Sequence, residues 1–363
     1  MKGLITKFPK KNRLYSQLNI WQRSYILKAK FPESYLKESH QVFKKNFLPK
    51  YQILDSNPSI EDSNVMAIYN KKFYNENKNQ QQVMDFKNSL KKFFSDKECV
   101  AIEIENLRQP ADQILKQDIA YKVLVSSSIF ENYGVDRMVD DQKKPILQEN
   151  VSGNYIDFHC DSLNLNVFPF YTAIVCVKSN SKAITSIIEA NDICKTLQKN
   201  YPQSFAILNE VEFIVQKITP PSFIEYSKPL KIIEKKDNQV FFNYSLLNGS
   251  DITSSYLPLL NKDSRFNRLQ INQALSDFKT CMRTSLKHHD FALDDRNQVL
   301  LIKNRQCVHN REQVNPTETR EVVYFVCDIA NFIKSENKQT QPFLLFPSGE
   351  ILNKIKDKKI IRD

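Results

Sequence analysis

The sequence predicts a mainly β protein with flanking helices, in the α+β class, built on an antiparallel sandwich or barrel. Short runs rich in Val, Ile, Phe and Tyr recur from residue 99 to residue 329, and such runs are typical of strands. Few helical patterns separate them, so the βαβ alternation of a parallel sheet is missing. The hydrophobic content of 41% is typical of a globular chain with a sizeable core.

The individual elements follow from the period of the apolar residues. Residues 1–95 are expected to form an N-terminal helical extension, on the patterns at 20–48 and 80–97. Residues 96–345 are expected to form the β domain, with an insert at about 210–265, and 346–363 a basic C-terminal tail. Further helices are predicted at 113–134, 186–200 and 268–286. Strands are predicted at 99–107, 154–161, 171–178, 204–218, 239–247, 298–309 and 320–329.

Composition excludes several classes of protein. The net charge is +11, but the basic residues are dispersed except at the two ends, which disfavours nucleic-acid binding as the main role. Seven cysteines without a CxxC pair predict reduced thiols in a cytoplasmic protein, with no disulfide framework. No run of eighteen apolar residues is present, so no membrane span is expected, and the first residues lack the apolar region of a secretory signal.

A candidate metal site begins at the segment DFHCD. On a strand His159 and Asp161 point to the same face, and Cys160 to the opposite face. His309 lies in a distant strand-like run that a closed sheet could bring to this pair. Two histidines and one carboxylate leave one face of Fe(II) open, and oxygenases use that face for a cosubstrate and dioxygen. The sequence thus indicates a non-haem iron site.

An arginine eleven residues after His309 strengthens this interpretation. Arg320 follows a loop with Asn315 and Pro316 and begins the next strand, so a hairpin is expected to bring it beside the metal. A 2-oxoglutarate cosubstrate buries a distal carboxylate, and arginine is the planar, permanently charged partner that such a group needs. The alternative is a surface ion pair with Glu318 or Glu321.

Other ligand sets remain open at this point. A zinc site of His159, Asp161, Cys307 and His309 is conceivable, because Cys307 shares the strand face of His309. The neighbouring His288 and His289 point to opposite faces of any strand and are interpreted as a solvated turn. Cys160 is interpreted as a packed thiol.

These motifs resemble the clavaminate synthase-like and taurine dioxygenase-like family of Fe(II)/2-oxoglutarate-dependent oxygenases, over about residues 98–330. The resemblance lies in the order and spacing of His159, Asp161, His309 and Arg320. It extends to the segment AITSIIEANDICKTL, to the block VLLIKNRQCVHNRE, which keeps Asn304 and Arg311, and to the leading strand and turn AIEIENLRQPAD.

The resemblance implies a double-stranded β-helix core (jelly-roll, cupin-like). It implies Fe(II) held by His159, Asp161 and His309, 2-oxoglutarate held by Arg320 and Thr185, and O2 as the second cosubstrate. The implied reaction is hydroxylation or desaturation of a small-molecule substrate, such as an amino-acid derivative, with release of succinate and CO2. Arg311 is a candidate substrate-binding residue.

The sequence departs from the family pattern at three positions. Lys303 replaces the usual Asp, Tyr324 stands where a second basic residue often occurs, and Asn267 replaces the Asp of an Arg-Phe-Asp found in members acting on amino acids. The last change puts a standard amino acid as substrate in doubt. A catalytically silent barrel that binds a metabolite or a protein stays open, as do a nucleic-acid-directed oxygenase and a homodimer formed through the N-terminal helices.

Overall fold

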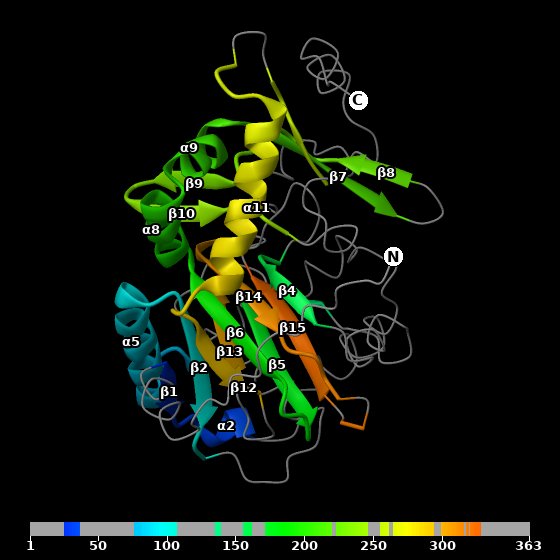
Figure 1. Cartoon of the computed structure of the whole chain (residues 1–363). Helices are drawn as coiled ribbons and strands as arrows, with labels where there is room; N and C mark the ends of the chain where they lie inside the picture. The colour runs from blue at the N-terminus through cyan, green and yellow to red at the C-terminus, as the bar shows by residue number, and fades with distance from the viewer. Residues whose placement is uncertain are drawn as a thin grey trace.

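The computed structural model describes residues 25–36, 76–106, 135–138, 155–161, 171–219, 223–245, 255–260, 264–293, 299–315, 317–318 and 320–327. In this part of the chain two β-sheets face each other, and helices cover the outer side of the smaller one (Figure 1). The predicted α+β class is confirmed.

The larger sheet has the strand order β1-β2-β13-β5-β15-β3. Its strands are β1 (Ile26–Ala29), β2 (Cys99–Ile104), β13 (Val299–Lys303), β5 (Tyr171–Ser179), β15 (Arg320–Cys327) and β3 (Val135–Met138). The smaller sheet has the order β12-β6-β14-β4. Its strands are β12 (His289–Ala292), β6 (Ile184–Glu189), β14 (Cys307–Arg311) and β4 (Ile156–His159). All pairs in both sheets are antiparallel except β1 with β2.

An apolar core fills the space between the two sheets. The larger sheet contributes Ala101, Ile174 and Leu300, and the smaller sheet contributes Ile187 and Cys307. Because side chains alternate along a strand, the neighbours of the last two face outward. The inner face of β6 and β14 therefore carries residues 185, 187, 307, 309 and 311, which places the candidate site residues of these strands inside the sandwich.

The outward face of the smaller sheet packs under three helices, α8 (Ala190–Asn200), α9 (Pro202–Glu210) and α11 (Arg268–Thr284). Helix α11, yellow in Figure 1, begins with a capping box in which Asn267 and Gln270 satisfy each other's backbone groups. Its apolar positions recur every three or four residues and are buried, as in Ile271, Leu275 and Phe278. The helical layer thus anchors the sheet that carries the two candidate histidine ligands.

Two small sheets extend this layer. One has the order β11-β7-β8, from β11 (Tyr256–Pro258), β7 (Phe213–Thr219) and β8 (Phe223–Tyr226). The other is the hairpin of β9 (Ile233–Lys236) and β10 (Gln239–Phe242). Its two-residue turn has positive φ at Asp237 (51°) and Asn238 (63°), the conformation that matches the twist of a tight hairpin.

The helical prediction for the N-terminal region is confirmed in one segment and wrong in another. Helix α5 (Gln81–Asp96) lies where the pattern at 80–97 predicts it, with Val83, Phe86 and Leu90 buried. Of residues 20–48 the structure describes 25–36; there, residues 26–29 form β1, which pairs with β2, and the helical part is the short α2 (Glu33–Leu36). Pairing along the edge of the large sheet overrides the weak helical period there. The helix expected at 113–134 and the tail 346–363 lie outside the described residues, and the domain division stays a prediction.

Three boundaries in the β region also differ from expectation. Residues 184–189 are strand β6, so the helix expected from 186 begins at Ala190. The run predicted as a strand at 204–218 is divided, because Pro202 starts α9 and β7 follows. The run at 298–309 forms two strands in different sheets, β13 and β14, joined by the 3₁₀ turn η3 (Asn304–Gln306). Likewise β14 and β15 are no hairpin, since the chain crosses between the sheets before Arg320.

Candidate metal centre

The two candidate histidine ligands lie directly opposite each other on neighbouring strands. His159 ends β4, His309 is the middle residue of β14, and the two are partners in the antiparallel register. Their ring centroids are 4.4 Å apart. Asp161 lies two residues beyond the end of β4. The predicted strand at 154–161 is thus confirmed for residues 156–159.

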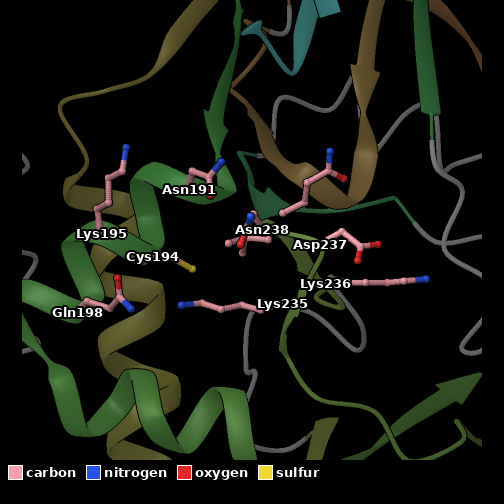
Figure 2. A pocket seen from close by; sticks show the side chains of 10 residues that line it. Asn191, Cys194, Lys195, Gln198, Lys235, Lys236, Asp237 and Asn238 are labelled. Atoms are coloured by element: carbon pink, nitrogen blue, oxygen red, sulfur yellow. The ribbon is translucent and has the colours of Figure 1, made fainter. Parts of the chain in front are cut away.

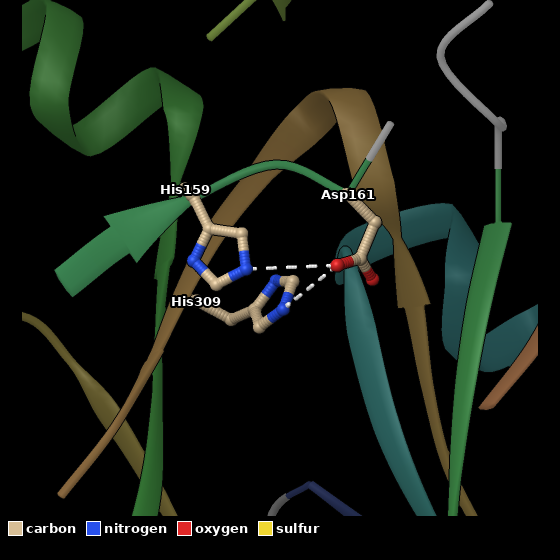
Figure 3. A group of neighbouring side chains, drawn as sticks. All are labelled: His159, Asp161 and His309. Carbon is tan, nitrogen blue, oxygen red and sulfur yellow. Dashed lines mark ion pairs between the residues drawn. The ribbon is translucent and has the colours of Figure 1, made fainter. Parts of the chain in front are cut away.

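The three side chains converge on one point (Figure 3). The Oδ1 atom of Asp161 lies 3.6 Å from Nε2 of His159 and 3.5 Å from Nε2 of His309. One ligand atom from each residue falls within a group no wider than 4.8 Å. The side chain of His309 is 5% exposed, and those of His159 and Asp161 are 16% and 22% exposed. The three side chains are thus mostly shielded from solvent.

Burial and the neighbouring charges shift the pKa values of all three groups. Burial works against the charged form of Asp161, but the imidazoles of His309 and His159 outweigh it and hold the pKa of Asp161 well below its usual value. Burial lowers the pKa of His309. For His159 burial acts in the same direction, but the hydrogen bond and charge of Asp161 prevail and raise its pKa. Metals bind the carboxylate and the neutral imidazole, so a cation at this site would displace the proton that Asp161 favours on His159.

Two further contacts fit a metal ion at this point. The Nδ1 atom of His159 lies 2.8 Å from the carbonyl oxygen of Asp157 and donates its proton to it, which leaves Nε2 as the atom directed at Asp161. The buried Oδ2 atom of Asp161 has no hydrogen-bond partner among the described residues. A buried carboxylate oxygen without a donor is costly, and a bound cation would satisfy it. The donor set suits Fe(II) of the two-histidine, one-carboxylate type.

The predicted cosubstrate residues also meet inside the sandwich. Arg320 begins β15 and is 5% exposed, and its Nη2 atom donates to Oγ1 of Thr185 at 2.9 Å. The surface ion-pair alternative for Arg320 is therefore wrong. Thr185 lies on β6, two positions from Ile187, which is the register partner of His309. Two residues of strand advance about 7 Å, comparable with the length of a five-carbon dicarboxylate.

Arg311, predicted to bind substrate, lies on the same inner face. It is 5% exposed and is the register partner of Thr185 on β6. Two buried arginines are thus neighbours of Thr185, Arg320 through a hydrogen bond and Arg311 through the strand register. The position of Arg311 beside Thr185 favours a contact with the cosubstrate, whereas the sequence predicted a contact with the substrate.

The remaining predicted ligands and departures lie elsewhere. The group of possible metal ligands includes His159, Asp161 and His309, without Cys307, whose thiol lies in the apolar core near the carbonyl oxygen of Glu98. The zinc alternative thus loses its fourth ligand. The packed-thiol interpretation of Cys160 is confirmed, as it is fully buried under the helical layer. Asn267 is the N-cap of α11.

The predicted solvated turn at His288 and His289 is wrong. His289 begins strand β12 and is half-buried, and its ring stacks on that of Tyr25, with the centroids 3.8 Å apart. The Nε2 atom of His288 lies 3.5 Å from Oδ2 of Asp290. Neither histidine belongs to the metal group. Edge-strand pairing with β6, which the sequence pattern did not reveal, accounts for their burial.

Two supporting contacts were not predicted. Asp157, buried beneath α11, receives hydrogen bonds from Nη2 and Nε of Arg283 at 2.5 and 3.1 Å, and its backbone orients His159. Asn304, noted in the sequence only as a shared position, bonds the backbone of Asp161. Local sequence patterns could not predict either contact, because each contact joins segments more than a hundred residues apart in the chain.

A separate pocket of about 430 Å³ lies between α8 and the β9–β10 hairpin. Figure 2 shows Asn191, Cys194, Lys195 and Gln198 on the helix, with Lys235 extending toward it from the hairpin. None of the candidate metal or cosubstrate residues lines this pocket. It is a feature of the helical layer and is distinct from the site inside the sandwich.

Comparison with known proteins bears on the fold. No protein-family model matches the sequence, and no curated protein matches it. A solved asparagine oxygenase in complex with Fe(II), 2S,3S-3-hydroxyasparagine and succinate is 12% identical, with a TM-score of 0.51 over 82% of this chain and 92% of that one. The non-heme iron oxygenase OrfP in complex with Fe and alpha-ketoglutaric acid is 10% identical, with a TM-score of 0.51 over 87% of this chain and 98% of that one.

The chain shares the fold of these iron oxygenases. At such low identity the likeness concerns the fold, and the chemistry has to be argued from the residues of this chain. No described helix is both long and apolar enough to cross a membrane.

Proposed function

We propose that the chain is an Fe(II)- and 2-oxoglutarate-dependent oxygenase with a double-stranded β-helix core. The observation that carries the proposal is the convergence of His159, Asp161 and His309 inside the sandwich, with an unsatisfied oxygen of Asp161 among the described residues. The buried Arg320–Thr185 pair on the same inner side of the sandwich gives the proposal a second, independent support.

In this proposal His159, Asp161 and His309 hold the iron. The guanidinium of Arg320 receives the distal carboxylate of 2-oxoglutarate in a bidentate pair. The hydroxyl of Thr185 accepts from Arg320, which leaves its own proton to donate to the same carboxylate. Arg311, beside Thr185 in register, adds positive charge at that end of the cosubstrate. Bound iron and cosubstrate would supply the oxidising chemistry, and the protein supplies position and exclusion of water.

The overall reaction balances as substrate, 2-oxoglutarate and O2 converted to hydroxylated substrate, succinate and CO2. The substrate that we infer is a small polar molecule such as an amino-acid derivative. The OrfP structure and the asparagine oxygenase structure support this class, because both share the fold and the latter holds a hydroxylated amino acid. Desaturation would use the same protein residues. No disulfide joins the six buried cysteines whose side chains the structure describes, which supports a reducing compartment such as the cytoplasm.

The decisive test is spectroscopic. Fe(II) and 2-oxoglutarate are added to the metal-free protein without oxygen, and the visible spectrum is recorded for the wild type and for His309→Ala. We expect a weak charge-transfer band in the wild type and none in the variant. Absence of the band at saturating cosubstrate would contradict the oxygenase proposal and favour a silent, metabolite-binding protein.

The substrate class is tested separately. Amino acids and their derivatives are incubated with the iron-loaded protein, 2-oxoglutarate and O2, and the products are followed by mass spectrometry. We expect a product heavier by one oxygen atom, with succinate in equal amount. Failure of every such compound, while other small molecules are oxidised, would refute the substrate class alone.

A further inference from the structure

The backbone of Asp161 is held by a single side chain. Strand β4 ends at His159, so the sheet does not position the carboxylate ligand that follows. Instead the N–H of Asp161 donates to Oδ1 of Asn304 at 2.7 Å, and the carbonyl oxygen of Asp161 accepts from Nδ2 of Asn304 at 2.7 Å. Both polar backbone groups of the ligand residue therefore bond one amide.

Asn304 itself is rigidly placed. It is completely buried, and it begins the 3₁₀ turn that joins β13 of the large sheet to β14, the strand of His309. The preceding Lys303 ties this turn to α5 and to the residue before β2, since its Nζ lies 3.0 Å from the carbonyl oxygen of Phe94 and 2.6 Å from Oε2 of Glu98. The turn thus holds His309 and Asp161 at a fixed separation.

The chemistry of the contact requires a carboxamide of this length. An asparagine offers one donor and one acceptor in a plane, which matches the N–H and C=O of a single residue. Aspartate lacks the donor, serine is too short to reach both groups, and alanine would leave two buried backbone groups without these bonds. Groups that orient metal ligands typically change metal affinity 10- to 100-fold when they are removed.

We propose that Asn304 is a positioning residue that clamps Asp161 against the two imidazoles and thereby sets the affinity of the metal centre. The inference rests on the proposed metal site. It does not depend on oxygenase turnover, because any divalent ion with the same preference for imidazole and carboxylate reports on it. Lys303, which departs from the family pattern, has a structural role here as the anchor of the turn.

Ni²⁺ is the probe, because imidazole-containing sites bind it more tightly than Fe²⁺ and weakened variants stay measurable. Its affinity is measured by calorimetry for the wild type, Asn304→Ala and Asn304→Ser. The matched control is Asn106→Ala. Asn106 makes the same pair of bonds to Phe31, accepting from its N–H at 3.0 Å and donating to its carbonyl oxygen at 2.7 Å, away from the metal group.

We expect both Asn304 variants to bind Ni²⁺ about 10- to 100-fold more weakly, and Asn106→Ala to bind it as the wild type does. Thermal unfolding of the metal-free proteins shows which of the variants are folded, and Asn304→Ser provides the measurement if Asn304→Ala is not. Wild-type affinity in the folded Asn304 variants would overturn the clamp and leave the metal centre standing. Lack of Ni²⁺ binding by the wild type would overturn the centre itself.

A double-mutant cycle separates positioning from general destabilisation. If Asn304 acts through the carboxylate of Asp161, Asn304→Ala should cost nothing further once Asp161→Ala has removed that carboxylate. An equal loss of Ni²⁺ affinity in both backgrounds would show that Asn304 acts on the whole site, and it would overturn the positioning role.

Discussion

Replacement of Arg320 by lysine gives the sharpest test of the cosubstrate site. The substitution keeps the positive charge and most of the length of the side chain. Its single ammonium group cannot serve Oγ1 of Thr185, at 2.9 Å from Nη2 of Arg320 in the native protein, and also both oxygens of a carboxylate in one plane. At least one charge-assisted hydrogen bond is lost.

The magnitude follows from the burial of this pair. Arg320 is 5% exposed and Thr185 is 2% exposed, so solvent does not replace the missing bond. A hydrogen bond to a charged group contributes about 1.5–3 kcal/mol, which corresponds to roughly a 10- to 150-fold weaker affinity for 2-oxoglutarate. Arg320→Leu, which removes the guanidinium paired with the buried carboxylate, should cost about 3–5 kcal/mol.

The assay is calorimetric titration of 2-oxoglutarate into the Ni²⁺-loaded protein. Ni²⁺ affinity measured without cosubstrate should be the same in the wild type and in Arg320→Lys, since Arg320 does not belong to the metal group. Arg265→Lys is a control, because it makes the same change in an exposed pair with Glu210. Wild-type affinity for 2-oxoglutarate in Arg320→Lys would refute the assignment of the distal carboxylate to this arginine.

Three further predictions concern the hydroxyl, the core and acid stability. Thr185→Val keeps the shape of the side chain but removes the hydroxyl, so calorimetry should show about 2- to 10-fold weaker binding of 2-oxoglutarate, from the loss of about 0.5–1.5 kcal/mol. Phe278→Ala empties a site that is fully buried against Phe242 and Tyr244 and should lower the free energy of unfolding in urea by about 3–5 kcal/mol, with Ni²⁺ affinity retained. Burial lowers the pKa of His289 from 6.5 to about 4, so the unfolded chain binds the proton first and stability should fall as the pH drops from 6.5 to 4. His289→Phe should lessen this fall in the free energy of unfolding between pH 7 and pH 5. The same fall in the variant and in the wild type would show that His289 is not its cause.

The sequence by itself indicated which residues form the candidate site, because their types and spacing are local features of the chain. The period-two runs predicted most of the strands, and the spacing of His159 and Asp161 indicated a shared ligand pair, although β4 ends at His159 and strand alternation does not extend to Asp161. The spacing of His309 and Arg320 carried the resemblance to iron oxygenases. Residue chemistry alone then indicated which groups suit iron and which suits a carboxylate.

The tertiary structure decided what no local pattern contains, namely which distant strands meet and in which register. It placed His159 opposite His309, brought Arg320 of one sheet to Thr185 of the other, and moved residues 26–29 from a predicted helix to the edge of the large sheet. It also set Asn304 against Asp161, 143 residues earlier in the chain. Such contacts arise from sheet packing and chain crossovers. Because their free energy is a sum over the whole core, local sequence patterns do not reveal them.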